Sequence, residues 1–487
     1  MNRGIRRVGT GILVLFLAIV GQLTYLQVFR SNDLKNNPNN VRAFIRDINR
    51  PRGPIITADG AIVADSKPTK GELKQQREYP LGSLFSHVVG YQSIVYGTTG
   101  VERTYNNSLV GSDVQLSLKN LGQLLNGQSR VGTVVLTLSK AAQQAAHDGL
   151  AGKRGSVVAL NVKTGGVVAM YSEPSFDPNP LANHNSNNVQ KVQQALLAAP
   201  DNPELPRAWR ERYPAGSTFK VVTTSLALDD GIATPDRVFP TLRELPLPQT
   251  NNTLQNFGGE ICGGTLEQSF TVSCNTTFGA LGLELGEQLA SGVERFGLNV
   301  APPPADISPS VIRSLGPTRG TFKDNQPVFA QAAIGQNAIE VTPLEMAMIA
   351  ASVGNGGKMM VPHVVSEVRD AQNRTVRRIP PQVWRQAMTP ATATTVTRFM
   401  VNVVDHGTGT AAQIPGVVVA GKTGTAQVQG KAPHAWFVAF APAANPQYAV
   451  AVLVENGGNL GSDATGGRVA APIAAQVLRV LLAQQPQ

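Results

Sequence analysis

The most continuous apolar stretch of the chain lies at its N-terminus. Residues 8–29 are almost entirely apolar, and their core 11–20 carries no charge. That length allows one helical crossing of a bilayer, and the three arginines before it favour a cytoplasmic N-terminus. A cleaved signal peptide is the alternative, but residues 22–29 offer no clear small-residue cleavage site. Residues 1–29 are therefore predicted to be a cytoplasmic tip and a single transmembrane anchor in the cell membrane, with the remaining chain on the extracytoplasmic face.

The next segment, residues 30–130, is polar and rich in Asn, Gly and Gln. Short apolar runs flank Asp59-Gly60, a dipeptide that favours a tight turn between two strands. No pair of acids shows the pattern of a glycan cleft, and the segment is too short to hold a glycan-polymerising domain as well. It is predicted to be a mostly β pedestal, a dimerisation-like domain without chemistry of its own.

From residue 131 the pattern changes to separated apolar runs. Residues 157–160 and 167–170 flank Lys163-Thr164-Gly165 and predict a hairpin. Three later runs and a terminal helical pattern predict further elements, namely strands at 417–420, 435–440 and 448–454 and a helix at 469–482. Strands from both ends that enclose a helix-rich stretch predict one mixed α/β domain over residues 131–487. Three Asn- and Pro-rich segments, 177–206, 247–258 and 301–317, are predicted to be surface loops, some at the rim of a cleft.

Composition narrows the choice of partners. The chain has 487 residues, which predicts two or three domains. A net charge of +10 could suit nucleic acid, but no run of Lys or Arg is interleaved with aromatic residues. Attraction to an anionic membrane or cell wall accounts for the charge, so no nucleic-acid partner is predicted.

One Ser-x-x-Lys motif, from Ser217 to Lys220, opens an apolar helical run. A spacing of three residues places both side chains on one face of a helix, where the amine can reach the hydroxyl. A serine with an adjacent base is an activated nucleophile. A helix N-cap followed by an exposed lysine is the plain alternative.

Two further motifs favour the catalytic interpretation. Ser273-Cys274-Asn275 follows a helical run, and Lys422-Thr423-Gly424-Thr425 extends the strand predicted at 417–420. Ser-x-x-Lys, Ser-x-Asn and Lys-Thr-Gly in this order are typical of penicillin-binding proteins and class A β-lactamases, with Cys274 in the position of Asp. The other Lys-Thr-Gly, at 163–165, precedes Ser217 and occupies the predicted hairpin turn, so it is interpreted as structural.

Taken together, the chain resembles class B penicillin-binding proteins, in particular those of actinobacteria. The resemblance extends over nearly the whole length, from the anchor through 52–55 and 100–103 to the three motifs, and includes 335–337 and 434–437. It implies the serine β-lactamase/penicillin-binding transpeptidase fold, an α/β (α+β) architecture. That fold has a central antiparallel sheet, helices on both of its faces and a helical lobe.

The resemblance also implies a role for each catalytic residue. Ser217 would attack the carbonyl of a terminal D-Ala-D-Ala bond, or a β-lactam ring, and form an acyl-enzyme. Lys220 would take the serine proton, which requires a pKa lowered by burial and by a second cation, Lys422. Ser273 would relay the proton to the leaving D-Ala.

The remaining motif residues would bind the substrate. The Asn275 side chain would hold the substrate amide, and Thr423 and Thr425 would bind the terminal carboxylate. Gly424 would let a peptide backbone approach the strand closely. The backbone N–H groups of Ser217 and Thr425 would form the oxyanion hole.

The cysteines and histidines leave fewer options. Cys262 and Cys274 could form a disulfide outside the cytoplasm, or Cys274 could be a small buried apolar residue. The six histidines show no metal-ligand spacing, so neither a metal nor a cofactor is predicted. His434 could line the cleft, although a structural role is favoured, and His406 is assigned to a turn.

The implied function is a peptidoglycan D,D-transpeptidase that cross-links stem peptides during growth and division. Its ligands would be D-Ala-D-Ala donors, amine acceptors and β-lactams, and its family-implied partners a membrane glycan polymerase and other division or elongation proteins. A D,D-carboxypeptidase or β-lactamase of the same fold, and a β-lactam-binding scaffold or sensor, are the alternatives. No Glu-x-x-Leu-Asn segment of the kind that activates water in class A β-lactamases occurs, which favours transfer to an amine.

Overall fold

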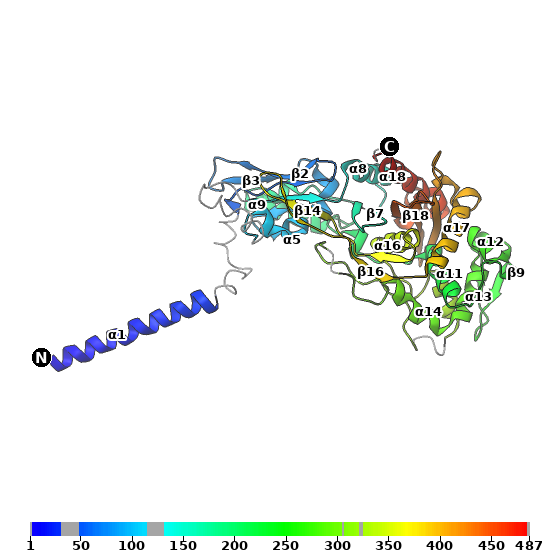
Figure 1. Ribbon diagram of the computed structural model, residues 1–487, viewed down its shortest axis with the longest axis horizontal. Coiled ribbons are helices and arrows are strands. Elements are labelled where there is room, and N and C mark those ends of the chain that lie inside the picture. Colours follow the sequence, from blue (N-terminus) through cyan, green and yellow to red (C-terminus); the bar gives the residue numbers. More distant parts are fainter. Residues whose placement is uncertain (1, 31–47, 114–130, 304–305, 321–324, 485–487) are drawn as a thin grey trace.

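The computed structural model describes residues 2–30, 48–113, 131–303, 306–320 and 325–484. Figure 1 shows an N-terminal helix that stands apart from a smaller β-rich part and a larger α/β part. Helix α1 (Asn2–Thr24) continues into the π-helical turn η1 (Tyr25–Phe29). The apolar span Arg6–Val28 is long enough to cross a membrane, and none of it is buried in the structure. An exposed apolar helix of this length at the N-terminus suggests a membrane anchor.

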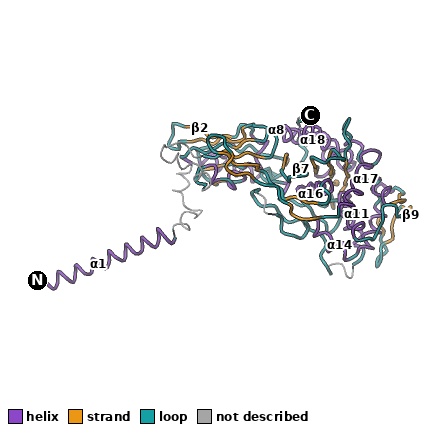
Figure 2. The backbone as a smooth tube through the Cα atoms, in the orientation of Figure 1, coloured by secondary structure: helices purple, strands orange, loops and turns teal. Residues whose placement is uncertain are grey.

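A six-stranded sheet forms the pedestal, and Figure 2 shows its strands in orange. Its strand order is β15 (Thr375–Arg378), β14 (Val365–Arg369), β6 (Thr133–Leu136), β1 (Ile55–Ile56), β2 (Ile62–Pro68) and β3 (Gln75–Glu78). The pair β1–β6 is parallel, and the other neighbours are antiparallel. The predicted turn at Asp59-Gly60 is confirmed, because β1 and β2 pair on either side of it.

The pedestal sheet combines segments that are far apart in the sequence. Strands β14 and β15 come from within the 131–487 range, yet they complete a sheet that begins at Ile55. Asp306 holds the start of β14 against the pedestal. Its carboxylate accepts hydrogen bonds from the backbone N–H groups of Val364 and Val365 and from the Tyr105 hydroxyl. The pedestal is therefore not one continuous stretch of the chain, because β14 and β15 lie far along the sequence from its other strands.

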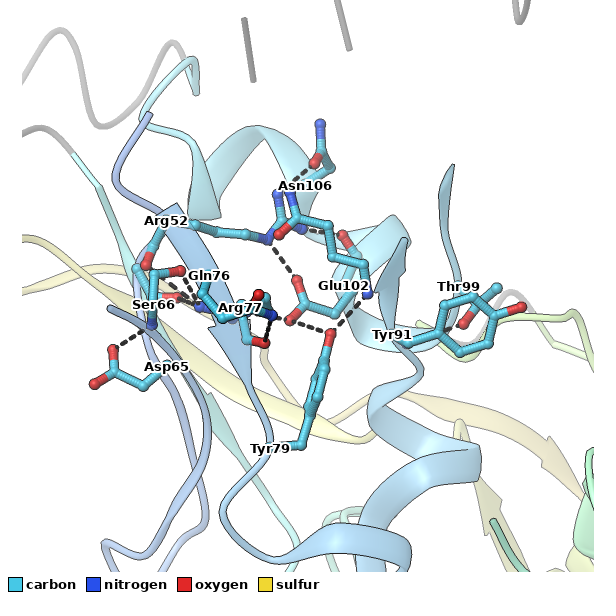
Figure 3. A network of polar contacts seen from close by, with 12 residues as sticks. Arg52, Asp65, Ser66, Gln76, Arg77, Tyr79, Tyr91, Thr99, Glu102 and Asn106 are labelled. Carbon is cyan, nitrogen blue, oxygen red and sulfur yellow. Dashed lines mark hydrogen bonds and ion pairs between the residues drawn. The ribbon is translucent and has the colours of Figure 1, made fainter. Parts of the chain in front are cut away.

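A buried ion network stabilises the pedestal (Figure 3). Glu102, on α5 (Gly100–Thr104), accepts a hydrogen bond from Arg52 Nε at 2.5 Å and from Arg77 Nε at 2.6 Å. The Tyr79 hydroxyl points to the same carboxylate, and Arg52 also donates to the Asn106 side chain. Burial alone would raise the pKa of Glu102, but the two guanidinium groups outweigh it and hold that pKa below its ordinary value.

The larger part is built on a five-stranded antiparallel sheet. Its order is β17 (Ala420–Val428), β18 (Lys431–Ala441), β19 (Tyr448–Val454), β7 (Gly155–Asn161) and β8 (Val167–Glu173). The predicted hairpin at 157–170 is confirmed, and so is the strand at 448–454. The strand predicted at 417–420 begins only at Ala420, so the Lys-Thr-Gly motif lies inside the strand rather than at its end.

Helices cover this sheet from both sides, as Figure 1 shows for α8 and α18 above the strands and α16 below them. Helix α18 (Ala471–Ala483) confirms the predicted terminal helix. Helix α16 (Pro343–Gly354) has no exposed residue, and its N-terminus is set by Pro343 and by Thr342, whose side chain accepts from the Glu345 N–H. The remaining helices of this part are α8 (Lys140–Leu150), α10 (Arg207–Arg210), α11 (Lys220–Asp229), α12 (Leu266–Thr271), α13 (Asn275–Leu285), α14 (Glu287–Gly292), α15 (Pro327–Ala333) and α17 (Pro390–His406), whereas Figure 1 places α9 (Ser186–Ala198) beside the pedestal strands.

Two of the predicted loops contain regular structure. The segment 177–206 holds the 13-residue helix α9, which begins where the Asn185 side chain caps the first free N–H groups. The segment 247–258 includes β11 (Thr253–Gln255), which pairs with β10 (Glu244–Pro246). The Asn and Pro content that suggested loops serves here as cap and hairpin chemistry. Two further small pairs, β9 (Val238–Leu242) with β12 (Cys262–Thr265) and β13 (Lys358–Met360) with β16 (Val383–Gln386), complete the helical lobe.

Replacing Glu102 by Ala should destabilise the pedestal strongly. The change leaves Arg52 and Arg77 buried without a counter-charge, a loss of about 3–5 kcal/mol of unfolding free energy. Urea unfolding of the full chain, followed by hydrogen–deuterium exchange of pedestal amides, measures it. Glu78→Ala is the matched control, because its partner Lys67 is solvent-exposed and the pair should contribute nothing measurable. Equal effects of the two changes would contradict this account of the network.

Candidate active site

An open cleft with a volume of about 810 Å³ runs between the helical lobe and strand β17. All three motifs contribute to its walls. Its lining includes the motif side chains Ser217, Ser273, Asn275, Thr423 and Thr425. Residues that lie far apart in the sequence thus meet at one surface.

Ser217 sits on a 3-10 turn, η5 (Gly216–Phe219), that leads directly into α11. The preceding Gly216 has a φ of +54°, and a side chain there would press on Ala426 of β17 at about 3 Å. Gly335 backs the same turn, because a Cβ at that position would lie 2.0 Å from the Gly216 carbonyl oxygen. The segment around Ser217 is therefore held between β17 and the chain after α15 by glycine-to-backbone packing.

Lys220 lies beneath the cleft and has no solvent exposure. Its Nζ donates to the Ser273 carbonyl oxygen at 2.7 Å, to Ser273 Oγ at 3.2 Å and to Asn275 Oδ1 at 2.8 Å. An ammonium can donate to all three acceptors at once, whereas a neutral amine, with two N–H groups, can donate to only two of them. Among the described residues no hydrogen bond joins Lys220 to Ser217, so the contact expected from helical spacing alone is replaced by contacts to the Ser-x-Asn motif.

Lys422 is equally buried and approaches the same serine from the sheet. Its Nζ donates to Ser273 Oγ at 2.9 Å and to the Thr423 carbonyl oxygen at 3.2 Å. The Ser273 hydroxyl thus lies between the two amines. Aromatic rings close the space around them, with Phe278 facing Lys220 and Phe270 facing Lys422.

Burial without a carboxylate partner changes the charge of both amines. Burial, and then the positive charge of Lys422, lower the pKa of Lys220 well below its ordinary value. Burial lowers the pKa of Lys422 to about 7. Both shifts favour the neutral form of the amine, and a neutral amine is the form that can accept a proton.

The Ser-x-Asn motif is held in an unusual backbone conformation. Ser273 has a φ of +65°, a region that costs a residue with a side chain about 1–3 kcal/mol. Backbone bonds from the Ser273 N–H to Phe270 and from the Cys274 N–H to Ser269 fix the turn. A disulfide joins Cys274 to Cys262 and confirms the disulfide interpretation, which ties β12 to the motif.

Asn275 does more than face the cleft. Its Oδ1 accepts from Lys220, and its Nδ2 donates to the Gln255 carbonyl oxygen at 3.0 Å. The side chain therefore connects the buried lysine to the last residue of β11, and its amide nitrogen donates there.

The Lys-Thr-Gly strand presents two threonines to the cleft. The Thr423 hydroxyl is 2.6 Å from that of Thr408, and both line the cleft together with Thr425. Gly424 faces inward, because a Cβ there would meet Thr218 at 2.9 Å and the Ala215 carbonyl oxygen at 3.1 Å. The space that Gly424 provides is thus needed by the segment around Ser217 itself, which differs from the expected room for a peptide.

A second buried network fixes the chain just before the nucleophile. Glu455 accepts from the Tyr213 hydroxyl at 2.8 Å, from Arg207 Nε at 3.0 Å and from Arg154 Nε at 2.5 Å. Trp436 packs against the Tyr213 ring and donates its Nε1–H to the Pro214 carbonyl oxygen. Trp436 lies in the segment 434–437 that carried the resemblance, but no motif pointed to Tyr213 or Glu455, which are far apart in the chain.

The other residues considered from the sequence have structural positions. Lys163 lies in the β7–β8 turn and contacts the Asn355 side chain, away from the cleft lining. His434 accepts a hydrogen bond from the Asn456 N–H and does not line the cleft, and burial lowers its pKa. His406, assigned to a turn from the sequence, is instead the last residue of helix α17, and the turn begins only after it, so this assignment is corrected. Gln336, from the segment 335–337, also lines the cleft, and the lining residues Thr408, Gln427 and Thr465 belong to no motif that the sequence analysis recognised.

The fold and the site together define a class of protein. A serine at the start of a helix, a buried lysine with a lowered pKa, a second serine and a Lys-Thr-Gly edge strand are the groups that penicillin-binding proteins combine for serine acyl transfer. A family model for the penicillin-binding protein transpeptidase domain matches residues 155–479, and one for the penicillin-binding protein A dimerisation domain matches residues 52–135. The chain belongs to the class B penicillin-binding proteins, which are serine peptidoglycan D,D-transpeptidases.

Particular relatives show how far the similarity extends. The peptidoglycan D,D-transpeptidase PbpA of Mycolicibacterium smegmatis is 39% identical over 97% of both chains, and that of Mycobacterium tuberculosis is 37% identical over the full length of both. The structure of penicillin-binding protein A from M. tuberculosis as a ceftriaxone acyl-enzyme complex superposes with a TM-score of 0.84 at 37% identity, covering 90% of this chain and all of that one. PBP2 of Pseudomonas aeruginosa is more distant, with a TM-score of 0.75 at 30% identity, covering 90% of this chain and 96% of that one.

Replacing Tyr213 by Phe should slow acylation of the enzyme by a fluorescent penicillin several-fold. The change removes the hydroxyl bond to Glu455 that fixes the segment before Ser217 but keeps the ring packing on Trp436. Tyr171→Phe is the matched control, since it removes a similar bond to Glu173 on β8, at the opposite edge of the sheet from β17. Each change should cost about 1 kcal/mol of unfolding free energy, so a difference in acylation rate between the two variants cannot come from stability. Equal acylation rates of the two variants would contradict a positioning role for Tyr213.

Proposed function

We propose that the chain cross-links peptidoglycan stem peptides with Ser217 as nucleophile and Lys220 as general base. The observation that carries this assignment is the Ser273 hydroxyl, which lies between the two buried amines directly beneath the cleft that Ser217 lines. A neutral Lys220 can accept the Ser217 proton when a substrate brings the side chains together, because catalytic contacts often tighten only in the complex.

The acylation step follows from this arrangement. Ser217 Oγ attacks the carbonyl of the D-Ala-D-Ala bond as its proton passes to Lys220. The proton then moves through Ser273, which already bonds both lysines, to the amine of the leaving D-Ala. Collapse of the intermediate releases D-Ala and leaves an ester on Ser217. An amine from a neighbouring stem peptide attacks that ester and completes the cross-link.

Substrate binding is assigned to the edge strand and the Ser-x-Asn motif. Thr423 and Thr425 bind the terminal carboxylate together with Lys422. The negative charge of the bound carboxylate raises the pKa of Lys422 and so favours its ammonium form. The backbone N–H groups of Ser217 and Thr425 form the oxyanion hole, a contribution of about 3–4 kcal/mol for a donor of this kind. Asn275 holds the substrate amide. β-Lactams acylate Ser217 in the same geometry, in keeping with the acyl-enzyme complexes of the relative from M. tuberculosis.

The anchor and pedestal set the cellular context. Residues 1–29 form a cytoplasmic tip and one membrane crossing, and the catalytic domain lies on the extracytoplasmic face, since the arginines flank the helix on its N-terminal side. Residues 30–130 are assigned to the pedestal and residues 131–487 to the transpeptidase domain, except that strands β6, β14 and β15 complete the pedestal sheet. A membrane glycan polymerase and other division or elongation proteins are the partners of this arrangement, because the cross-linking reaction needs a supply of new glycan strands.

Ser217→Ala should abolish covalent labelling of the full-length, detergent-solubilised chain by a fluorescent penicillin. Wild-type label should persist for hours, because the site holds no assigned group that activates water. Gel fluorescence after denaturation measures the adduct, and Ser225→Ala, in the buried part of α11, is the control that keeps the label. Rapid loss of wild-type label with turnover would indicate a hydrolase, and absence of label would leave only a scaffold.

Lys220→Arg should lower the acylation rate about 10²- to 10⁴-fold, because a guanidinium cannot act as a base. In the wild type the rate should fall as pH decreases through the pKa of Lys220, since protonation removes the base. That pKa is lowered, so the rate should reach its plateau well below pH 10.5. Stopped-flow acylation across pH tests both points. Lys163→Arg, in the other Lys-Thr-Gly, should leave rate and profile unchanged, and a profile that rises only near pH 10.5 would exclude Lys220 as the base.

A further inference from the structure

A second hollow adjoins the catalytic cleft, and the proposed chemistry does not use it. It has a volume of about 660 Å³, within the range of about 300–1,000 Å³ that is usual for small-molecule sites. Thr253 lines both the cleft and the hollow. Likewise Gln336 lines the cleft and the next residue, Asn337, lines the hollow. A ligand bound at Ser217 can therefore extend into it.

The polar groups of the hollow are all uncharged. Within the described part of the chain no Lys, Arg, Asp, Glu or His lines it. Its amide side chains are Asn251, Asn252, Asn325, Gln331 and Asn337. Neutral amides both donate and accept, so they fit a neutral ligand with hydroxyl and amide groups and give no advantage to an ammonium or a carboxylate.

These amides have hydrogen-bonding capacity to spare. Asn337 Nδ2 donates to Gln331 Oε1 at 2.8 Å, which orients the two side chains. The Gln331 amide nitrogen and the Asn337 amide oxygen then have no partner among the described residues. The same holds for the side chains of Asn251 and Asn252, on the turn between β10 and β11. Polar groups that are already hydrogen-bonded within the protein have no donors or acceptors left for a ligand. The amide groups of this hollow that lack a partner among the described residues can still bond one.

An apolar floor accompanies the amides. Leu247 and Val328 are buried with 6% and 7% exposure, and Pro327 lies beside them. The two borders of the floor are joined by a bond from the Gln326 N–H to the Gln249 side chain at 3.0 Å. A flat apolar base beneath amide donors and acceptors suits a pyranose ring, which has a C–H face and a rim of hydroxyl and acetamido groups.

The distribution of charge along the cleft predicts the orientation of the bound donor stem peptide. The threonines of β17 lie at one wall with Lys422 buried behind them, and this is the wall to which the terminal carboxylate is assigned. The hollow lies beyond the wall formed by β11 and the chain after α15, and it carries no charge among described residues. A donor strand has the matching polarity: a carboxylate at its D-Ala terminus, an amine or acid on its middle side chains, and neutral amino sugars at its attachment point.

We propose that this hollow is a glycan subsite, which binds the N-acetylated amino sugars to which the donor stem peptide is attached. The inference rests on the proposed function of the cleft and adds to it a preference for donors that carry their sugars. Asn252 and Gln331 are assigned as sugar-binding residues.

The test compares two donors on the detergent-solubilised full-length chain. One is a pentapeptide that ends in D-Ala-D-Ala, and the other is the same pentapeptide attached to an N-acetylglucosaminyl-N-acetylmuramoyl disaccharide. Release of D-Ala is measured with glycine as the added amine. The disaccharide should lower KM about tenfold, the effect of one or two hydrogen bonds, with little change in kcat. Asn252→Ala combined with Gln331→Met should reduce that advantage to less than twofold.

Controls separate this inference from the proposed function. The double variant should keep wild-type kinetics on the free pentapeptide and wild-type acylation by penicillin, and Asn187→Ala, on the exposed face of α9, should keep the full advantage. Equal KM values for the two donors in the wild type would overturn the glycan subsite while penicillin acylation still supports the proposed function. An equal gain from a longer peptide without sugar would also overturn it, because the hollow would then bind peptide. Loss of penicillin acylation in the wild type would instead contradict the proposed function.

Discussion

Two lysine amines are buried under the cleft, and among the described residues neither has a carboxylate partner. An unpaired buried ammonium is so unfavourable that the group releases its proton instead. The pKa of Lys220 is lowered both by its complete burial and by the positive charge of Lys422. Phe270 and Phe278 maintain the dry environment, and Ser273 Oγ provides the only polar group that both amines share in the described structure. The lowered pKa of Lys220 is thus a consequence of packing.

Close backbone packing brings the three motifs within reach of this pair. A side chain at Gly335 would overlap the Gly216 carbonyl, and one at Gly466 would overlap that of Trp436 at 2.0 Å. Gly424 gives the same room to Ala215 and Thr218. Because these contacts join backbone to backbone, the positions of the serine turn and the edge strand are set with little freedom. The strained turn at Ser273 is then tolerated, since hydrogen bonds and the disulfide on Cys274 hold it in place.

The polar networks outside the cleft connect segments that are far apart in sequence. Glu455 binds Tyr213 and two arginines next to the segment that contains Ser217. In the pedestal, Glu102 binds Arg52 and Arg77 in a similar way. In both cases a buried carboxylate with two guanidinium partners replaces apolar packing at a junction. Removing one member leaves uncompensated charge, so these networks favour one arrangement of the chain over its alternatives. The neutral amide hollow beside the cleft differs from them, because its groups are not consumed by internal partners.

The amino-acid sequence by itself determined the anchor helix, the β7–β8 hairpin, the strand β19, the terminal helix α18 and the choice of Ser217, Lys220, Ser273 and Lys422, because these depend on local periodicity and on short motifs. Only the tertiary structure decided what Lys220 contacts, which way Gly424 faces and whether Cys274 is bonded. It also decided that β14 and β15 complete the pedestal sheet and that Glu455 supports Tyr213. These features arise from pairs of residues separated by tens to hundreds of positions, and no local pattern encodes which distant segment fills a given space.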